Sequence, residues 1–173
     1  MLTHGRPGET AAALKTLHRV AVELGWTLRF DPEEVEKHGL AEAEGLALNV
    51  PITDHVDLCI ALGGDGTILR ALRRYTGTKV PVFGVNYGEI GFLATIDPDH
   101  LGEGFARAFR GEFDVLTLSA LELESRNGEH AAINDISFHR KAGQRVATLA
   151  YVVDGEEVGS VRCDGLVVAT PAG

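Results

Sequence analysis

Residues 57–85 read DLCIALGGDGTILRALRRYTGTKVPVFGV, and this stretch decides the fold class. The apolar run 57–62 predicts a short buried strand that ends at two glycines. Residues 67–75 then predict a helix, and residues 80–85 predict the next strand. A strand, a glycine turn, a helix and a second strand form the repeating unit of a doubly wound α/β domain.

The segment upstream of this stretch fits the same fold class. Residues 10–24 carry apolar side chains at helical spacing and stop at Gly25. Residues 26–30 predict a short strand, and the charged segment 31–44 gives a weak signal for a short helix. Doubly wound domains usually open with a strand, whereas this sequence is predicted to open with a loop and a helix.

The pattern changes in the second half of the chain. Apolar and acidic residues alternate in 121–124, which is typical of a half-exposed strand. Asn127–Gly128 and Asp154–Gly155 are hairpin signals. We therefore expect a Rossmann-like or flavodoxin-like α/β domain over residues 1–108. An incomplete antiparallel β domain, similar to a β-sandwich, is expected over residues 109–173.

Composition and charge restrict the function classes. The 173 residues carry a formal net charge of −9 and contain no block of Lys or Arg. This argues against nucleic acid or an anionic membrane as the main partner. No run is long and apolar enough to span a membrane, and the start lacks a signal-peptide core, so we expect a cytoplasmic protein. Cys59, Cys163 and the histidines show no metal-ligand spacing, which predicts no metal-ligating residue.

The turn Gly63–Thr67 is the sharpest candidate site. Its glycines allow close approach of a ligand, and its N–H groups, at the start of a helix, suit a phosphate. Asp65 would repel a bare phosphate, but a carboxylate there can hold a metal ion or accept a proton from an attacking hydroxyl. The alternative is that Asp65 caps the following helix. The turn is neither a P-loop nor a GxGxxG motif.

Three further features carry weaker signals. The loop 86–93 follows a strand, and its Phe92 either stacks on a base or belongs to the core. Asn134–Asp135 lies among apolar residues and is either a turn or a ligand contact. Arg162 and Asp164 have a spacing of two, which would direct both to one side of a strand, with a local ion pair as the alternative.

Together these motifs resemble the NAD kinase family of the bacterial type. That family shows GGDGT, an NxGxxGFL loop, an Asn-Glu or Asn-Asp pair, and a DGL stretch leading to TP[TS]G. In this sequence the motifs stand in the same order, at 63–67, 86–93, 134–135, and 164–166 leading to 170–173. GGDGT alone is shared with phosphofructokinases and lipid kinases, whereas four motifs in order are far more specific.

The resemblance implies phosphoryl transfer from ATP, or in some members polyphosphate, to the 2′-hydroxyl of the adenosine ribose of NAD. It implies NADP as product and a dimeric or tetrameric full-length protein. Because the sequence has no P-loop lysine, Mg²⁺ or another divalent cation is expected to offset the phosphate charge. Asp65 is then the base on the hydroxyl. The substrate-binding positions implied are Gly66, Arg70, Phe92 in the adenine pocket, Asn134, Asp135, Arg145, Arg162, Asp164 near the nicotinamide, and Ala172.

The sequence departs from the family pattern at its last motif. Ala172 stands where the family has Thr or Ser, and the sequence stops at Gly173 inside the motif. We therefore expect an N-terminal portion of such an enzyme, inactive or nearly so by itself. The alternatives are another GGDGT kinase, acting on a lipid or sugar phosphate, and a non-catalytic nucleotide-binding module. The absence of basic or apolar membrane-facing stretches disfavours a lipid kinase.

Overall fold

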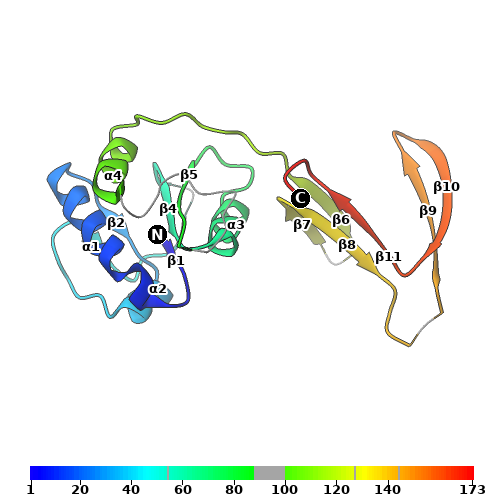
Figure 1. Cartoon of the computed structure of the whole chain (residues 1–173), viewed down its shortest axis with the longest axis horizontal. Helices are drawn as coiled ribbons and strands as arrows, with labels where there is room; N and C mark the ends of the chain where they lie inside the picture. Colours follow the sequence, from blue (N-terminus) through cyan, green and yellow to red (C-terminus); the bar gives the residue numbers. More distant parts are fainter. Residues whose placement is uncertain (54, 88–99, 127, 144) are drawn as a thin grey trace. The chain divides into compact units, whose positions relative to one another are not determined.

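The computed structural model describes residues 1–53, 55–87, 100–126, 128–143 and 145–173. These residues form two compact units, Met1–Leu116 and Thr117–Gly173, whose helices and strands are drawn in Figure 1. The division into folding domains at residues 108 and 109 stays a prediction. Within the described residues, no helix combines the length and the apolar character needed to cross a membrane.

Parallel strands form the centre of the first unit. One sheet has the order β1 (Leu2–Thr3), β4 (Cys59–Leu62) and β5 (Val82–Val85), with every pair parallel. A second parallel pair joins β2 (Leu28–Arg29) to β3 (Leu46–Ala47). The expected α/β class with a parallel sheet is confirmed. The prediction that the chain opens without a strand is wrong, because a strand of two residues leaves no periodicity in the sequence.

Four helices lie among the described residues of this unit, and those predicted over residues 10–24 and 67–75 begin and end close to the predicted bounds. They are α1 (Pro7–Glu23), α2 (Pro32–His38), α3 (Asp65–Arg74) and α4 (Leu101–Phe109). Sequence patterns did not predict α4, because glycines at 102 and 104 are unfavourable inside a helix. Burial of its aromatic side chains in the core overrides that weak propensity.

Alternating side chains of β4 supply two hydrophobic clusters. Ile60 and Leu62 pack with residues of α1 and α4, whereas Cys59 and Ala61 pack with residues of α3. All four residues of β4 are buried. Side chains on successive strand positions point to opposite faces of a sheet, so β4 is covered on both faces. Because β4 is buried on both faces, its carboxyl end, where the GGDGT turn begins, has a fixed position in the sheet.

The second unit consists of antiparallel pairs. Strand β6 (Leu121–Ser125) pairs with β7 (Gly128–Ala132), and β9 (Ala147–Val153) pairs with β10 (Glu156–Cys163). Strand β8 (Asp135–His139) pairs with β11 (Gly165–Ala169).

Both predicted hairpin signals lie where one strand passes into its antiparallel partner. Asp154 and Gly155 have φ of 51° and 84°, as a two-residue type I′ turn requires. At the other hairpin signal, Asn127 lies outside the described residues, and the strands on either side pair as expected. The expected antiparallel class of this part of the chain is confirmed.

Candidate functional site

The GGDGT turn lies at the carboxyl end of β4 and is bonded to the end of β5. The Gly63 N–H donates to the Val85 carbonyl at 3.0 Å, and the Gly63 carbonyl accepts from the Tyr87 N–H at 3.3 Å. In parallel sheets, ligands bind in the crevice outside the carboxyl ends of the strands. The turn therefore occupies the edge of the sheet where a substrate is expected.

Gly63 has no room for a side chain. A Cβ at this position would lie 2.5 Å from the Thr67 Oγ1 and 3.1 Å from the His4 Cβ. His4 directly follows β1, and Thr67 is buried in the first turn of α3. The close approach of both side chains brings the end of β1, the end of β4 and the start of α3 together at one point.

Asp65 is the first residue of α3, and Gly64 occupies the N-cap position. Asp65 is therefore not the N-cap residue itself, and its role at the site stays a prediction. Asp65 is half-buried, and nothing lies within 4 Å of a Cβ built on the neighbouring Gly66. The helix start therefore presents a carboxylate beside open main chain, where the positive end of the helix dipole attracts anions.

Arg70 lies on the same helix and reaches the last residue of β1. Its Nη2 donates to the Thr3 carbonyl at 3.0 Å. Thr3 is fully buried, whereas Arg70 is an exposed residue. This hydrogen bond holds the Arg70 side chain at the end of β1, which lies beside the GGDGT turn. Asp65, Gly66 and Arg70 thus belong to one group in the first unit.

A buried polar cluster supports β1 and was not predicted. The Glu34 carboxylate accepts from the Thr3 N–H at 3.0 Å and from the Thr3 Oγ1, and lies 2.6 Å from the Lys37 Nζ. Glu34 is only 2% exposed. The one local signal was Asp31, three residues earlier, whose side chain caps α2 by accepting from the Glu34 N–H.

Burial and hydrogen bonding act in opposite directions on this cluster. Burial alone would raise the pKa of Glu34, but the hydrogen bonds from Lys37 and Thr3 and the charge on Lys37 hold it below its ordinary value. Burial lowers the pKa of His38, whose Nε2 lies 2.8 Å from the Thr3 Oγ1. Glu34 is therefore ionised in the folded protein, and the neutral form of His38 is favoured.

The second unit gathers another group of predicted residues at the ends of β8 and β11. The Thr170 Oγ1 donates to the Ile133 carbonyl at 2.6 Å, and the Thr170 N–H donates to the Asn134 carbonyl at 2.8 Å. Asp135 stands opposite Ala169 in the ladder. The Ala172 N–H donates to the Thr170 Oγ1 at 3.1 Å. Asn134, Asp135 and Ala172 thus lie in one small region.

Two details of this region bear on ligand binding. A Cβ at Gly173 would lie 2.6 Å from the Asn134 carbonyl carbon, so the last glycine packs on the main chain of the Asn-Asp pair. The Asn134 Oδ1 is buried and has no hydrogen-bond partner among the described residues. A buried acceptor without a partner is costly, and a bound ligand is one way to satisfy it.

The other predicted site residues of the second unit are Arg145, Arg162 and Asp164. The strand ends at Cys163, so Asp164 lies in a bend between β10 and β11 and not on one strand face with Arg162. That prediction is wrong. Asp164 instead pairs with the Arg140 Nε, a partner that no sequence motif marks. Arg145 and Arg162 are exposed.

Most of the predicted loop 86–93 lies outside the residues that the structure describes. Phe92, with residues 88–93 of the loop, lies outside the described residues. In the described parts of the chain, no three His, Cys, Asp or Glu side chains gather as a metal site. Burial raises the pKa of the Cys59 thiol to about 11, so this cysteine is not a nucleophile at neutral pH.

Comparison with known proteins finds matches among NAD kinases. The family model described as "ATP-NAD kinase N-terminal domain" matches residues 17–113. An NAD kinase of Gemmatimonas aurantiaca is 37% identical over 168 residues, which cover 94% of this chain and 56% of that protein. An NAD kinase of Chlorobaculum tepidum is 35% identical over 146 residues, covering 83% and 50% respectively.

Two solved structures share the fold. The crystal structure of an NAD kinase from Archaeoglobus fulgidus in complex with ATP is 25% identical, with a TM-score of 0.54, over 82% of this chain and 60% of that chain. Yeast NADH kinase complexed with NADH has a TM-score of 0.69 at 23% identity, over 93% of this chain and 54% of that chain. The chain spans about half the length of the curated relatives it matches.

Proposed function

This chain belongs to the ATP-NAD kinase family, and from that premise we propose that the protein phosphorylates NAD. The γ-phosphoryl group of ATP, or the terminal phosphoryl group of polyphosphate in its place, passes to the 2′-hydroxyl of the adenosine ribose. With ATP, the bond between the ribose oxygen and the γ-phosphorus forms, the bond from that phosphorus to the β-phosphate oxygen breaks, and ADP leaves. With polyphosphate, the leaving group is the chain shortened by one phosphate. The product is NADP.

The position of the GGDGT turn supports this proposal more than any other observation. Asp65 stands at the start of α3, beside the ends of parallel strands β1, β4 and β5. A ribose hydroxyl is a weak acid, so the carboxylate mainly orients it and takes its proton late in the transfer. The main chain at Gly66 and the guanidinium of Arg70 are proposed to contact the nucleotide. Catalysis then rests on positioning.

Magnesium fits this scheme as part of the substrate. The described residues contain no ready-made cage of carboxylates, histidines or thiolates. Mg²⁺ is typically held by one or two carboxylates together with substrate phosphates. We infer that it enters with ATP, whose phosphates supply most of the ligands.

The second unit is proposed to contact NAD. Asn134 offers the buried Oδ1 described above, and Asp135 follows it at the start of β8. Ala172 can contribute its main chain but no hydroxyl. Arg145, Arg162 and Asp164 are proposed as further binding positions, and Phe92 as part of the adenine pocket. A dimer or tetramer in the cytoplasm is the proposed state of the protein.

The test is NADP formation from NAD, ATP and Mg²⁺. Because the chain spans about half of its relatives, the assay uses the 173 residues alone and fused to the remaining segment of the Gemmatimonas aurantiaca NAD kinase. We expect turnover by the fusion and a loss of about 10²–10⁴-fold in kcat on Asp65→Asn. Nucleotide binding by a folded fusion without any turnover would favour a binding module, and a lipid or sugar substrate would indicate another GGDGT kinase.

A further inference from the structure

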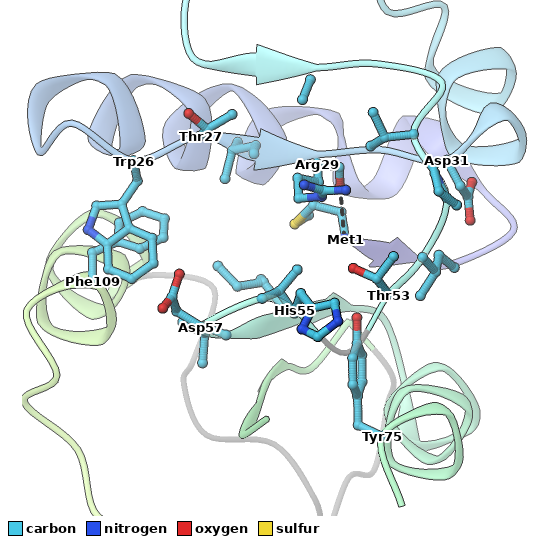
Figure 2. Close-up of a pocket in the computed structure, with 18 of the residues that line it drawn as sticks. Met1, Trp26, Thr27, Arg29, Asp31, Thr53, His55, Asp57, Tyr75 and Phe109 are labelled. Carbon is cyan, nitrogen blue, oxygen red and sulfur yellow. Dashed lines mark hydrogen bonds between the residues drawn. The ribbon is translucent and has the colours of Figure 1, made fainter. Parts of the chain in front are cut away.

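Helix α2 is joined to β1 by side chains that lie outside the four sequence motifs. The Met1 amino group donates to the Arg29 carbonyl of β2 at 3.0 Å, the dashed line in Figure 2. Two residues further along, the Thr3 N–H donates to the Glu34 carboxylate of α2 at 3.0 Å. Asp31, labelled in the same view, caps this helix. The edge of β1 that faces away from β4 is therefore bonded first to β2 and then to α2.

Thr3 ends β1 at the point where the GGDGT turn meets the sheet. The next residue, His4, donates its N–H to the Leu62 carbonyl at 2.8 Å. The His4 Cβ lies 3.1 Å from a Cβ built on Gly63, the first residue of the turn. The Thr3 carbonyl accepts from the Arg70 Nη2 at 3.0 Å. The position of the Thr3 main chain therefore bears on both the turn and the Arg70 guanidinium.

Two cations meet at the Thr3 carbonyl. Besides the Arg70 Nη2, the Lys37 Nζ lies 3.4 Å from this oxygen. The Lys37 Nζ also lies 2.6 Å from the Glu34 Oε1. Like charges this close repel each other, and the repulsion is stronger where water is partly excluded. The carboxylate of Glu34 therefore neutralises the lysine that would otherwise compete with Arg70 for the carbonyl.

Burial makes this neutralisation necessary. The Lys37 side chain is 14% exposed and the Glu34 side chain 2%. An ammonium group that is largely buried without an anionic partner is costly and turns to the nearest acceptor. The nearest acceptors besides Glu34 are the Thr3 carbonyl and the Thr3 Oγ1, both 3.4 Å away. Loss of the Glu34 charge would therefore direct Lys37 onto the oxygen that orients Arg70.

The guanidinium of Arg70 is easily oriented by one bond. It is a planar, rigid fork of N–H donors, so a bond through Nη2 fixes the direction of the whole group. Arg70 is an exposed residue of α3, the helix that begins at Asp65. Binding groups that are held in place in advance lose less freedom when the ligand arrives. The bond to Thr3 therefore prepares Arg70 for the nucleotide that it is proposed to contact.

We infer that Glu34 is a positioning residue for nucleotide binding. It holds the Thr3 main chain and neutralises Lys37, and so keeps the Thr3 carbonyl for Arg70. The inference rests on the proposed function, because it takes Arg70 as a contact of the nucleotide. A purely structural Glu34 would change the stability of the first unit and leave the nucleotide affinity of the folded protein as it is.

The experiment measures Kd for Mg²⁺-ATP and for NAD by titration calorimetry, with the fusion used in the turnover assay. Arg70→Gln identifies the nucleotide that Arg70 contacts, whose Kd should rise by roughly 10–100-fold. Glu34→Gln should raise the same Kd by roughly tenfold. Glu33→Gln is the matched control, because the Glu33 side chain is 75% exposed and lies 4.0 Å from the Lys37 Nζ. It should leave both Kd values within about twofold.

Two double variants separate positioning from stability. In the Arg70→Gln background, Glu34→Gln should change this Kd by less than about twofold, because its effect acts through Arg70. Glu34→Gln combined with Lys37→Gln should bind within about threefold of the parent, because no unpaired cation then competes for the Thr3 carbonyl.

Several results would overturn the inference. They are a Kd that Glu34→Gln leaves unchanged, a Kd that it raises equally with and without Arg70, and an Arg70→Gln variant that binds both nucleotides like the parent. Glu34→Gln combined with Lys37→Gln that binds as weakly as Arg70→Gln would also overturn it, and this comparison holds even if Glu34→Gln alone does not fold. Failure of the proposed function is read separately, as a fusion that binds nucleotides but forms no NADP.

Discussion

The main-chain N–H of Thr3 donates to the buried carboxylate of Glu34, 31 residues away, at 3.0 Å. Thr3 ends β1, and its N–H and carbonyl face away from β4, because the neighbouring His4 N–H donates to the Leu62 carbonyl. On that open side Glu34 satisfies the donor and Arg70 satisfies the carbonyl. Side chains thus replace a neighbouring strand at the point where β1 meets the candidate site.

Glu34→Gln should destabilise the first unit. The amide cannot replace the charged hydrogen bonds with Thr3 and Lys37, and we expect a loss of about 1.5–3 kcal/mol in the free energy of unfolding. Urea unfolding followed by the fluorescence of Trp26, the one tryptophan, measures it. Glu33→Gln is the matched control, since the Glu33 side chain is 75% exposed, and should change stability by less than about 0.5 kcal/mol. Equal effects of the two changes would contradict the assigned role of Glu34.

His38 should make the first unit less stable in mild acid. Its pKa in the folded protein is lowered by burial and by the charge on Lys37, against the opposing charge of Glu34. A lowered folded pKa means that stability is full above the unfolded pKa, about 6.5, and is lost as pH falls below it. Glu34, whose folded pKa is also lowered, acts in a separate window below about 4.3.

His38→Gln tests this sign. The variant should lose the decline in unfolding free energy as pH falls below about 6.5, measured by Trp26 fluorescence. His130→Gln, an exposed change in the other unit, is the matched control and should keep the parent profile. A His38→Gln profile that still falls as steeply as that of the parent would rule out His38 as the cause.

Local patterns predicted the central strand, turn and helix around Gly63, because an apolar run, glycines and helical spacing are strong short-range signals. They missed β1, which is too short to show a period, and α4, whose glycines hide a helix stabilised by packing. The Glu34 cluster depends on contacts between distant residues, which spacing cannot show. The spacing of two between Arg162 and Asp164 predicts one strand face, whereas a bend at Asp164 separates β10 from β11.

The candidate site, like the fold, could be predicted only in part from the sequence. The family motifs identify Asn134 and Ala172 as candidate site residues. Their proximity follows from the pairing of β8 with β11 and from the hydrogen bonds of Thr170. The pairing of Asp164 with Arg140 has no sequence signal, because Arg140 belongs to no motif. Long-range register, rather than local propensity, decides which side chains meet.

Gly63→Ala should damage the GGDGT turn. The added Cβ would meet the Thr67 Oγ1 at 2.5 Å and the Thr67 Cβ at 2.8 Å, so the start of α3 must shift. We expect a loss of about 1–3 kcal/mol in unfolding free energy. Gly8→Ala, where nothing lies within 4 Å of the new Cβ, should instead stabilise α1 by up to about 0.5–1 kcal/mol. A neutral Gly63→Ala change would show that the turn is looser than this contact requires.

Thr170→Val should loosen the segment that closes on Asn134. Thr170 is 7% exposed, and its hydroxyl both donates to the Ile133 carbonyl and accepts from the Ala172 N–H. Valine keeps the shape but makes neither bond, so we expect a loss of about 1–2 kcal/mol and faster amide exchange at Ala172. Thr170→Ser keeps the hydroxyl and should preserve the slow amide exchange at Ala172. Thr148→Val, at an exposed position of β9, is the control for replacing a threonine by valine. If serine and valine at position 170 exchange alike, the hydroxyl does not hold this segment against the Asn-Asp pair.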